Sequence, residues 1–555
     1  MQYLAKNQIS YLICRSCLLI IFALGLEGRE INVPKDFKSV QEAINAAKPG
    51  DEVIVQPGTF RERLVMQAGV IVRSHGDDTK GLLGLKRAER TILNHAGGKG
   101  PGVSMALGAK LDGFTITGVG KYDESLWKKH YATQGNQQKH EHIGAPGTAG
   151  IAANHSCIIT NNIVHHVGYT GIAIMGVKGR KVSPHILNNV CYRNMGGGIG
   201  SMMGSTAIIE KNICFENFYA GIGHDDASPV VRNNICYKNI RAGIGISEGS
   251  SPRVTGNHCY KNRRAGIGIR TGVNTRPVIE DNDCIENAMA GIGTKEDARP
   301  IIRNNRCKAN KLAGIGCTDG AMPQILNNDC RENGAAGIGV EDGADARIEG
   351  NLCKGNKTTG IGVRANAKAL IINNQIIDNA MVAIGIRNGS KATIKGNKME
   401  RKGGMPPMVA VLEDSQVEVT GNSIHGGGVA GILLSGTANI NDNKFLGNGP
   451  RSGGPPNFAV WVREGSEIQF NNNNVDRWRH ALFASGAIAV HANDNQIKNF
   501  IGTAIVVKGS TTRVEVSGNK AHSLDSKAKT VDFPLKSGNV RNNELINKEK
   551  QGKKK

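Results

Sequence analysis

Four side chains that can move a proton lie in one segment, residues 121–147, and they are Tyr122, His130, His140 and His142. Phenol and imidazole groups serve as general acids and bases, and base-catalysed β-elimination or C5 epimerisation of a uronic acid needs such a base beside C5. His140 and His142 could instead bind a metal ion, but two alternating histidines are a weak signal for one. If the protein is an enzyme, we predict that these four residues are catalytic.

A second group of side chains recurs at regular distances further along the chain and is suited to binding. Aromatic rings can stack on sugar rings, and cationic side chains can pair with carboxylates or sulfates. Two glutamates of the group fall at turns, where they could act as paired catalytic carboxylates, ligate Ca²⁺ or remain solvated turn residues. The predicted binding residues are Tyr169, Tyr219, Arg241, Arg264, Arg270, Lys295, Glu248 and Glu296.

Most of these residues belong to a block that repeats through the middle of the chain. The core of the block is small-Gly-Ile-Gly, and a short Asn-x-Cys segment precedes it. The gaps between successive first glycines are 23, 22, 23, 25, 23, 23 and 23 residues. A fixed period of this size indicates one structural unit stacked on itself. The first glycines are Gly198, Gly221, Gly243, Gly266, Gly291, Gly314, Gly337 and Gly360.

Each repeat contains three short runs with two-residue alternation, which is typical of strands, and no stretch long enough for a helix. Three short strands per repeat predict one coil of an all-β, right-handed parallel β-helix. Alternation places Ala242, Ile244 and Ile246 inside the coil. It places Gly243 and Gly245 outside. We therefore predict a floor of two glycine columns, walled by the binding residues. A sugar chain could lie along it, or the glycines could relieve crowding under a covering loop or a neighbouring chain.

Residues at equivalent positions of successive coils should form ladders, because stacked strands lie about 4.8 Å apart. One predicted ladder consists of buried asparagines, whose amides can bond along the column. Another consists of eight of the twelve cysteines. We predict free, buried thiols there in preference to disulfides or metal ligands, because Val164 and Ile376 fill the same column. The ladders are Asn194, Asn217, Asn239, Asn262, Asn287, Asn310, Asn333, Asn356 and Asn379, and Cys191, Cys214, Cys236, Cys259, Cys284, Cys307, Cys330 and Cys353.

The repeat resembles the right-handed β-helix repeats of the pectin-lyase-like superfamily, including those of NosD-like proteins. The segment from Ile31 to Phe60 resembles the usual N-terminal entry of that superfamily, where a short helix caps the stack. Val40, Ala43, Ile44 and Ala47 have the helical spacing for such a cap. The resemblance implies one β-helix over residues 30–545, with the cap at 30–60, regular repeats at 186–400 and irregular coils at 401–545. It implies no single activity, because the superfamily contains lyases, hydrolases, epimerases, esterases and non-catalytic proteins.

The ends of the chain and its charge bear on location and partners. Residues 1–26 combine basic residues with a short apolar run, which predicts a signal peptide and an exported protein, either periplasmic, at the cell surface or extracellular. Residues 546–555 form a basic tail, and no later stretch is apolar enough for a transmembrane segment. The formal charge of +22 favours polyanionic partners. Aromatic residues make up only 4% and no nucleic-acid-binding motif occurs, so we predict no nucleic acid partner.

Three functional hypotheses follow from these observations. The leading one is binding of an acidic polysaccharide, together with cleavage or epimerisation if the protein is a lyase, epimerase or glycoside hydrolase. The second is a non-enzymatic surface or periplasmic scaffold that contacts proteins through its glycine face. The third, which rests on the resemblance to NosD-like repeats alone, is a copper-handling accessory. No cofactor is certain, and Ca²⁺ is the candidate ion.

Overall fold

The computed structural model describes residues 28–95, 99–450, 455–523, 525–533 and 538–547. The predicted signal peptide, residues 1–26, lies outside these ranges, as do residues 548–555 of the predicted basic tail. Within the ranges that are described, no helix is long and apolar enough to cross a lipid bilayer.

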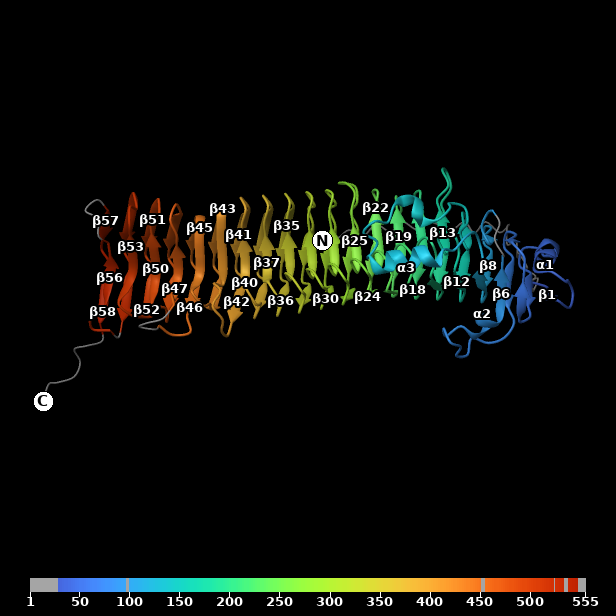
Figure 1. Ribbon diagram of the computed structural model, residues 1–555, viewed down its shortest axis with the longest axis horizontal. Helices are drawn as coiled ribbons and strands as arrows, with labels where there is room; N and C mark the ends of the chain where they lie inside the picture. The colour runs from blue at the N-terminus through green and yellow to red at the C-terminus, as the bar shows by residue number, and fades with distance from the viewer. Residues whose placement is uncertain (1–27, 96–98, 451–454, 524, 534–537, 548–555) are drawn as a thin grey trace, which may run out of the picture.

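The chain forms one elongated parallel β-solenoid of about 22 turns (Figure 1). A turn of the repeat region contributes three short strands, for example β22 (Ile244–Ser247), β23 (Arg253–Thr255) and β24 (His258–Tyr260). Each strand pairs in parallel with its equivalent in the next turn, so that Ile244 lies opposite Ile267. The predicted right-handed parallel β-helix is confirmed. We name the stacks that contain β22, β23 and β24 the first, second and third faces.

The strands of the repeat region fall into these three faces. The first face contains β13 (Ile172–Met175), β16 (Ile199–Met202), β19 (Ile222–Asp225), β22, β25 (Ile267–Ile269), β28 (Ile292–Thr294), β31 (Ile315–Cys317), β34 (Ile338–Val340), β37 (Thr359–Val363) and β40 (Val382–Ile386). The second face contains β14 (His185–Leu187), β17 (Ile208–Glu210), β20 (Val230–Arg232), β23, β26 (Val278–Glu280), β29 (Ile301–Arg303), β32 (Gln324–Leu326), β35 (Asp345–Glu349) and β38 (Lys368–Ile372). The third face contains β15 (Val190–Tyr192), β18 (Ile213–Phe215), β21 (Ile235–Tyr237), β24, β27 (Asp283–Ile285), β30 (Arg306–Lys308), β33 (Asp329–Arg331), β36 (Leu352–Lys354) and β39 (Gln375–Ile377).

Buried asparagines close two of the three corners in every repeat. At the corner between the second and third faces, the Asn257 side chain donates from Nδ2 to Asn282 Oδ1 at 2.9 Å and to the Val231 carbonyl at 3.0 Å. The predicted ladder occupies the corner between the third and first faces, where Asn262 Nδ2 donates to Asn287 Oδ1 at 3.0 Å. Since each buried amide is bonded to the next turn, the ladders fix the stacking of the coils.

The core inside the coils is apolar and continuous. The isoleucine column that includes Ile244 and the cysteine column that includes Cys259 are fully buried. All ten cysteines of the described ranges are unpaired and buried, which confirms the prediction of free thiols. Burial raises the pKa of one of them, Cys157, to about 12, so the uncharged thiol is the stable form there.

In the described part of the chain, helices occur only at the N-terminal cap and in segments that leave the solenoid. The predicted capping helix is present as α1 (Val40–Ala46), whose first turn is capped by the Ser39 hydroxyl, which accepts from the Glu42 N–H at 3.1 Å. One excursion, residues 75–90, ends in α2 (Lys86–Arg90). A longer one, residues 121–147, contains α3 (Glu124–Ala132) and the 3₁₀ turn η1 (His140–Ile143).

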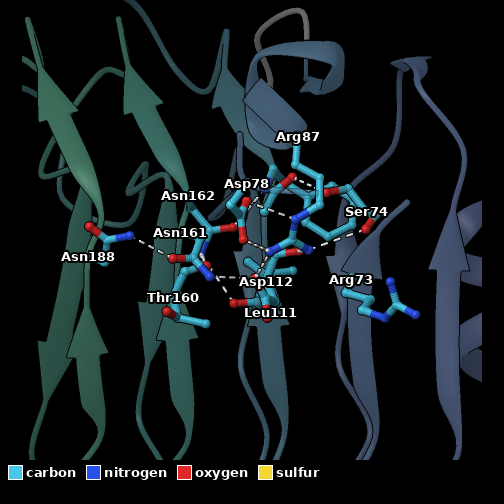
Figure 2. Close-up of polar contacts among 12 residues, drawn as sticks. Arg73, Ser74, Asp78, Arg87, Leu111, Asp112, Thr160, Asn161, Asn162 and Asn188 are labelled. Carbon is cyan, nitrogen blue, oxygen red and sulfur yellow. Dashed lines mark hydrogen bonds and ion pairs between the residues drawn. The ribbon is translucent and has the colours of Figure 1, made fainter. Parts of the chain in front are cut away.

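The shorter excursion is held by a buried arginine (Figure 2). Arg87 donates to both carboxylate oxygens of Asp78 at 2.9 Å and to Asp112 Oδ1 at 2.5 Å. Asn161 donates to the same Asp112 oxygen at 2.9 Å. Burial opposes the charge on Arg87, but the two carboxylates outweigh it and raise its pKa. The cluster therefore anchors α2 to the solenoid, and its charged groups find their hydrogen-bond partners within the cluster.

Candidate binding groove

A groove runs along the first face of the solenoid. It has a volume of about 1120 Å³ and extends from Ile143 of the long excursion to Leu412. Its floor contains the second glycine of each repeat, which lies on the outer side of the strand. These glycines are Gly200, Gly223, Gly245, Gly268, Gly293, Gly316, Gly339, Gly362 and Gly385.

The first glycine of each repeat does not face outward, so that part of the prediction is wrong. A Cβ at Gly243 would lie 2.7 Å from the Gly266 carbonyl oxygen and 2.8 Å from Asn262 Nδ2. Gly243 precedes β22 and lies in the bend after the asparagine corner, where the alternation of an extended strand does not apply. Ala242 lines the groove in its place, beside Gly245.

Six of the nine second glycines, from Gly223 to Gly339, are not required by packing within the protein, whereas a Cβ at Gly200, Gly362 or Gly385 would lie 3.1–3.3 Å from a threonine or valine side chain. A Cβ at Gly223 would meet nothing within 4 Å. At Gly268, the nearest atom would be the Ala242 Cβ at 3.6 Å, which is ordinary contact. From Gly223 to Gly339 the small residues therefore leave the floor open to a ligand and are not needed to relieve crowding inside the solenoid.

Two neighbouring glycines provide a matched test of this difference. We expect Gly266→Ala to lower the free energy of unfolding by about 2–3 kcal/mol. The reason is that its Cβ would lie 2.7 Å from the Gly291 carbonyl oxygen and 3.0 Å from Cys284 Cβ. We expect Gly268→Ala to change stability by less than about 0.5 kcal/mol, because its Cβ projects into the groove. Urea unfolding followed by circular dichroism measures both, and equal losses would contradict the assigned orientations.

Seven of the eight predicted binding residues line the groove. One wall is formed by a column that includes Tyr169 and Tyr219, and the opposite wall by a column that includes Met202 and Asp225. Glu296, the exception, forms an ion pair with Lys295. Beyond Tyr169 and Tyr219, the first wall consists of Arg241, Arg264, Met289, Leu312, Ala335, Thr358 and Met381, and the second, beyond Met202, of Asp225, Ser247, Arg270, Lys295, Thr318, Glu341, Arg364 and Arg387.

Three guanidinium groups gather around one tyrosine ring near the excursion. The Arg241 Cζ lies 4.7 Å from the centre of the Tyr219 ring, and Arg270 donates to the Tyr219 hydroxyl at 3.4 Å. Burial lowers the pKa of both Arg241 and Arg264, and neighbouring guanidinium charges lower them further. Within the described ranges, none of the three arginines pairs with a carboxylate. The positive charge of this cluster is thus not compensated by an ion pair with any carboxylate that the structure describes.

The long excursion docks on two of these arginines. Arg264 donates to the carbonyls of Gln134 at 3.1 Å and Gly135 at 2.6 Å. Arg241 donates to the Gln138 side-chain oxygen at 2.5 Å and to its carbonyl at 3.2 Å. These acceptors are neutral, so they satisfy N–H groups without cancelling charge. Figure 1 shows α3 lying across the strands near β18 and β19.

The excursion is also held by packing against the solenoid corner. Trp127 donates from Nε1 to the Glu216 carbonyl at 2.7 Å, and its ring lies under the Arg193 guanidinium, whose Cζ is 4.1 Å from the ring centre. Arg263 donates to the Tyr131 carbonyl at 3.0 Å. The segment that carries the predicted catalytic residues therefore docks at one end of the groove. Ile143 is the residue of this segment that lines the groove.

The predicted catalytic residues are divided between two places. The rings of His130 and His142 lie 5.2 Å apart. His142 accepts the Lys139 N–H at 3.2 Å, whereas the side chain of His140 lies outside the described part. Tyr122 donates to Glu124 at 2.8 Å instead of joining the histidines. Burial and the Glu124 carboxylate raise the pKa of Tyr122, which disfavours the phenolate that a catalytic base requires.

The two predicted glutamates adopt turn conformations. Glu248 and Glu296 have φ angles of 53° and 57°, the left-handed values of tight turns. Glu296 accepts from the Thr271 hydroxyl at 3.3 Å in addition to its pair with Lys295. Across the described ranges, no three His, Cys, Asp or Glu side chains converge as a metal site. These contacts favour the interpretation of the glutamates as turn residues.

Acid is expected to loosen the excursion through His130. This side chain is 1% exposed, and neither ring nitrogen has a hydrogen-bond partner among the residues that the structure describes. Burial lowers its pKa from the ordinary value of 6.5, and His142, Lys129 and Arg241 add repulsion. When the excursion is released, His130 binds a proton more readily than it does in the docked state. Docking is therefore strongest above pH 6.5 and weakens as the pH falls below 6.5. Limited proteolysis within residues 121–147 should therefore increase on acidification, and His130→Phe should abolish the increase.

Sequence reasoning missed two features of the surface. The groove wall continues from Arg264 through Met289 and Leu312, which counting the repeat period forward from Tyr219 would have shown. On the third face, a stack of parallel aromatic rings follows the same period, with successive centres 4.8–5.0 Å apart. The stacked residues are Tyr192, Phe215, Tyr237 and Tyr260.

Comparisons with known proteins concern the architecture. The family model described as "Right handed beta helix region" matches residues 139–275, 232–338 and 313–475. No curated protein matches the sequence significantly. Solved structures with some likeness include the periplasmic alginate epimerase AlgG, at 11% identity over 70% of this chain and 83% of that chain with a TM-score of 0.38. The catalytic unit of a GH87 alpha-1,3-glucanase from Streptomyces thermodiastaticus shows 12% identity over 71% and 66%, with a TM-score of 0.42. At such values the activities of those proteins say nothing about this chain.

Proposed function

Because the chain belongs to the family of right-handed β-helix proteins, we propose that it acts through the outer surface of its solenoid, as an exported protein that binds an acidic polysaccharide in the groove of the first face. The core inside the coils is filled by packed side chains, so a polymer has access only to the outside. The groove is long, open and floored by glycine and alanine, which suits an extended chain.

The arginine cluster is the observation that carries this proposal. Arg241, Arg264 and Arg270 meet around Tyr219, and their charges have no carboxylate partner among the described residues. A carboxylate or sulfate on a polymer would supply the missing charge through hydrogen bonds to the guanidinium groups. The ring of Tyr219 provides an adjacent surface for a sugar. The overall charge of +22 would attract the same ligands from a distance.

Turnover of the bound polymer is the finer part of the proposal. His142 lies beside His130 in the excursion that ends at the groove, and its half-buried imidazole is the candidate general base. An elimination would abstract the C5 proton of a uronic acid and expel the glycosidic oxygen from C4, leaving a double bond between C4 and C5. An epimerisation would return a proton to C5 from the opposite side and break no glycosidic bond.

The test is a binding and turnover screen of the purified chain without its first 26 residues against uronic-acid and sulfated polysaccharides, with and without Ca²⁺. Retention on an acidic polymer but not on a neutral one supports the proposal. Ultraviolet absorbance of an unsaturated uronate would indicate elimination, and exchange of the C5 proton with solvent without that absorbance would indicate epimerisation. Retention should be lost in Gly268→Leu, which fills the floor where the protein has free space. Absence of retention on every acidic polymer would refute it.

A further inference from the structure

The first wall of the groove changes its chemistry partway along. Tyr219, Arg241 and Arg264 form the section next to the excursion, and the next residues of the same column are Met289 and Leu312. The column ends with Ala335, Thr358 and Met381 and carries no charge beyond Arg264. The wall is thus cationic over its first section and uncharged over its second.

The apolar side chains of the second section are exposed to solvent. Met289 is 41% exposed, Leu312 47% and Met381 53%. All three project beside the small residues of the floor, and no excursion covers them within the described ranges. Large apolar side chains gathered in a groove favour a ligand that brings apolar groups of its own.

The opposite wall is neutralised from Lys295 to Arg364, whereas Arg387, in the turn of Met381, forms no ion pair with a described residue. Lys295 pairs with Glu296, and Arg364 donates to Glu341 at 2.6 Å. Three arginines without an ion-pair partner among the described residues therefore gather around Tyr219, whereas the turns of Met289 to Thr358 present an uncharged wall that faces compensated ion pairs. A polymer whose sugars carry charged groups but no apolar ones would gain little from this second section and would lose hydration there.

We propose that the groove prefers an acidic polysaccharide bearing O-acyl esters, with carboxylates at Arg241, Arg264 and Arg270 and acyl groups against Met289 and Leu312. This rests on the proposed function and names its substrate class. An O-acyl ester leaves the carboxylate of a uronic acid ionised, so one chain presents both chemistries. Leu312 lies two turns beyond Arg264, about 10 Å along the axis, so sugars of a single bound chain reach both sections.

The experiment compares the affinities of an O-acetylated polyuronate and of the same polymer after alkaline deacetylation. They are measured by isothermal titration calorimetry on the chain without its first 26 residues. We expect the acetylated polymer to bind about tenfold tighter. The double variant Met289→Asn with Leu312→Asn should bind both polymers with the affinity that the unaltered protein has for the deacetylated one. The control is Met322→Asn, because Met322 is 44% exposed but lies outside the groove, and it should keep the preference.

The outcomes separate this inference from the proposed function. Equal affinity for the two polymers leaves the acidic groove in place and overturns the acyl preference. Absence of binding to either polymer removes the proposed function itself. If the double variant instead changes the sedimentation coefficient of the protein without ligand, the apolar wall is a contact between copies of the chain, and the inference is wrong.

Discussion

Replacement of Asn305 by alanine is expected to lower the free energy of unfolding by about 3–6 kcal/mol. Asn305 is 1% exposed and donates from Nδ2 to the carbonyls of Ile279 and Arg303, both at 2.9 Å. Its Oδ1 accepts from the backbone N–H and the side chain of Asn282 at 3.0 Å and 2.9 Å. Alanine would leave several of these buried groups without partners, at about 1–3 kcal/mol each.

Asn304 provides the matched control for this substitution. It is exposed and has a φ angle of 55°, and glycine occupies the equivalent position two turns away on either side, at Gly256 and Gly350. Asn304→Gly should therefore change stability by less than about 1 kcal/mol. Urea denaturation monitored by circular dichroism compares the two variants. A loss below about 1 kcal/mol in Asn305→Ala would mean that the ladder does not hold the coils together.

The combined variant Arg264→Ala with Arg270→Ala is expected to weaken binding of an acidic polysaccharide by about 100-fold or more. A hydrogen bond to a charged group contributes about 1.5–3 kcal/mol, and 1.4 kcal/mol corresponds to a tenfold change in affinity. Both side chains line the groove and neither pairs with a described carboxylate. Binding by the unaltered protein should also weaken with added salt, more steeply than binding by the variant.

The variant Arg263→Ala tests whether the polymer binds to the groove or to the excursion. Arg263 holds the excursion through the Tyr131 carbonyl, and its Cζ lies 4.9 Å from the centre of the Tyr131 ring, but it is not part of the groove lining. We expect its affinity for the polymer to remain within about twofold of the unaltered protein. If Arg263→Ala lost as much affinity as the double variant, the excursion would be the binding surface and the groove arginines only its supports.

The repeat alone determined the architecture of this protein. The gaps of 22 to 25 residues place Ile244 over Ile267 and Cys236 over Cys259, and those registers are present. Local alternation and a constant period suffice here, because each coil contacts mainly its neighbours. The asparagine ladder, the free thiols and the helix α1 could be predicted for the same reason: each depends on a residue type repeated at one register or on helical spacing within a few residues.

The groove could be predicted only in part. Counting within the repeat brought Arg241, Arg264 and Arg270 to one surface, because they occupy equivalent or adjacent positions of successive turns. The orientation of Gly243 could not be obtained in that way, since the chain bends between the asparagine corner and β22 and the two-residue alternation starts only after the bend.

Only the tertiary structure decided where the excursion docks on the groove. Gln138 lies 103 residues before Arg241, and Gln134 lies 130 residues before Arg264, yet each pair is hydrogen-bonded. No repeat period relates the excursion to those turns, so its docking depends on its shape and on its hydrogen bonds to the solenoid. The sequence determined which side chains share a face, because a periodic stack fixes their register. The tertiary structure decided which of them remain available to a ligand, because that depends on a segment outside the period.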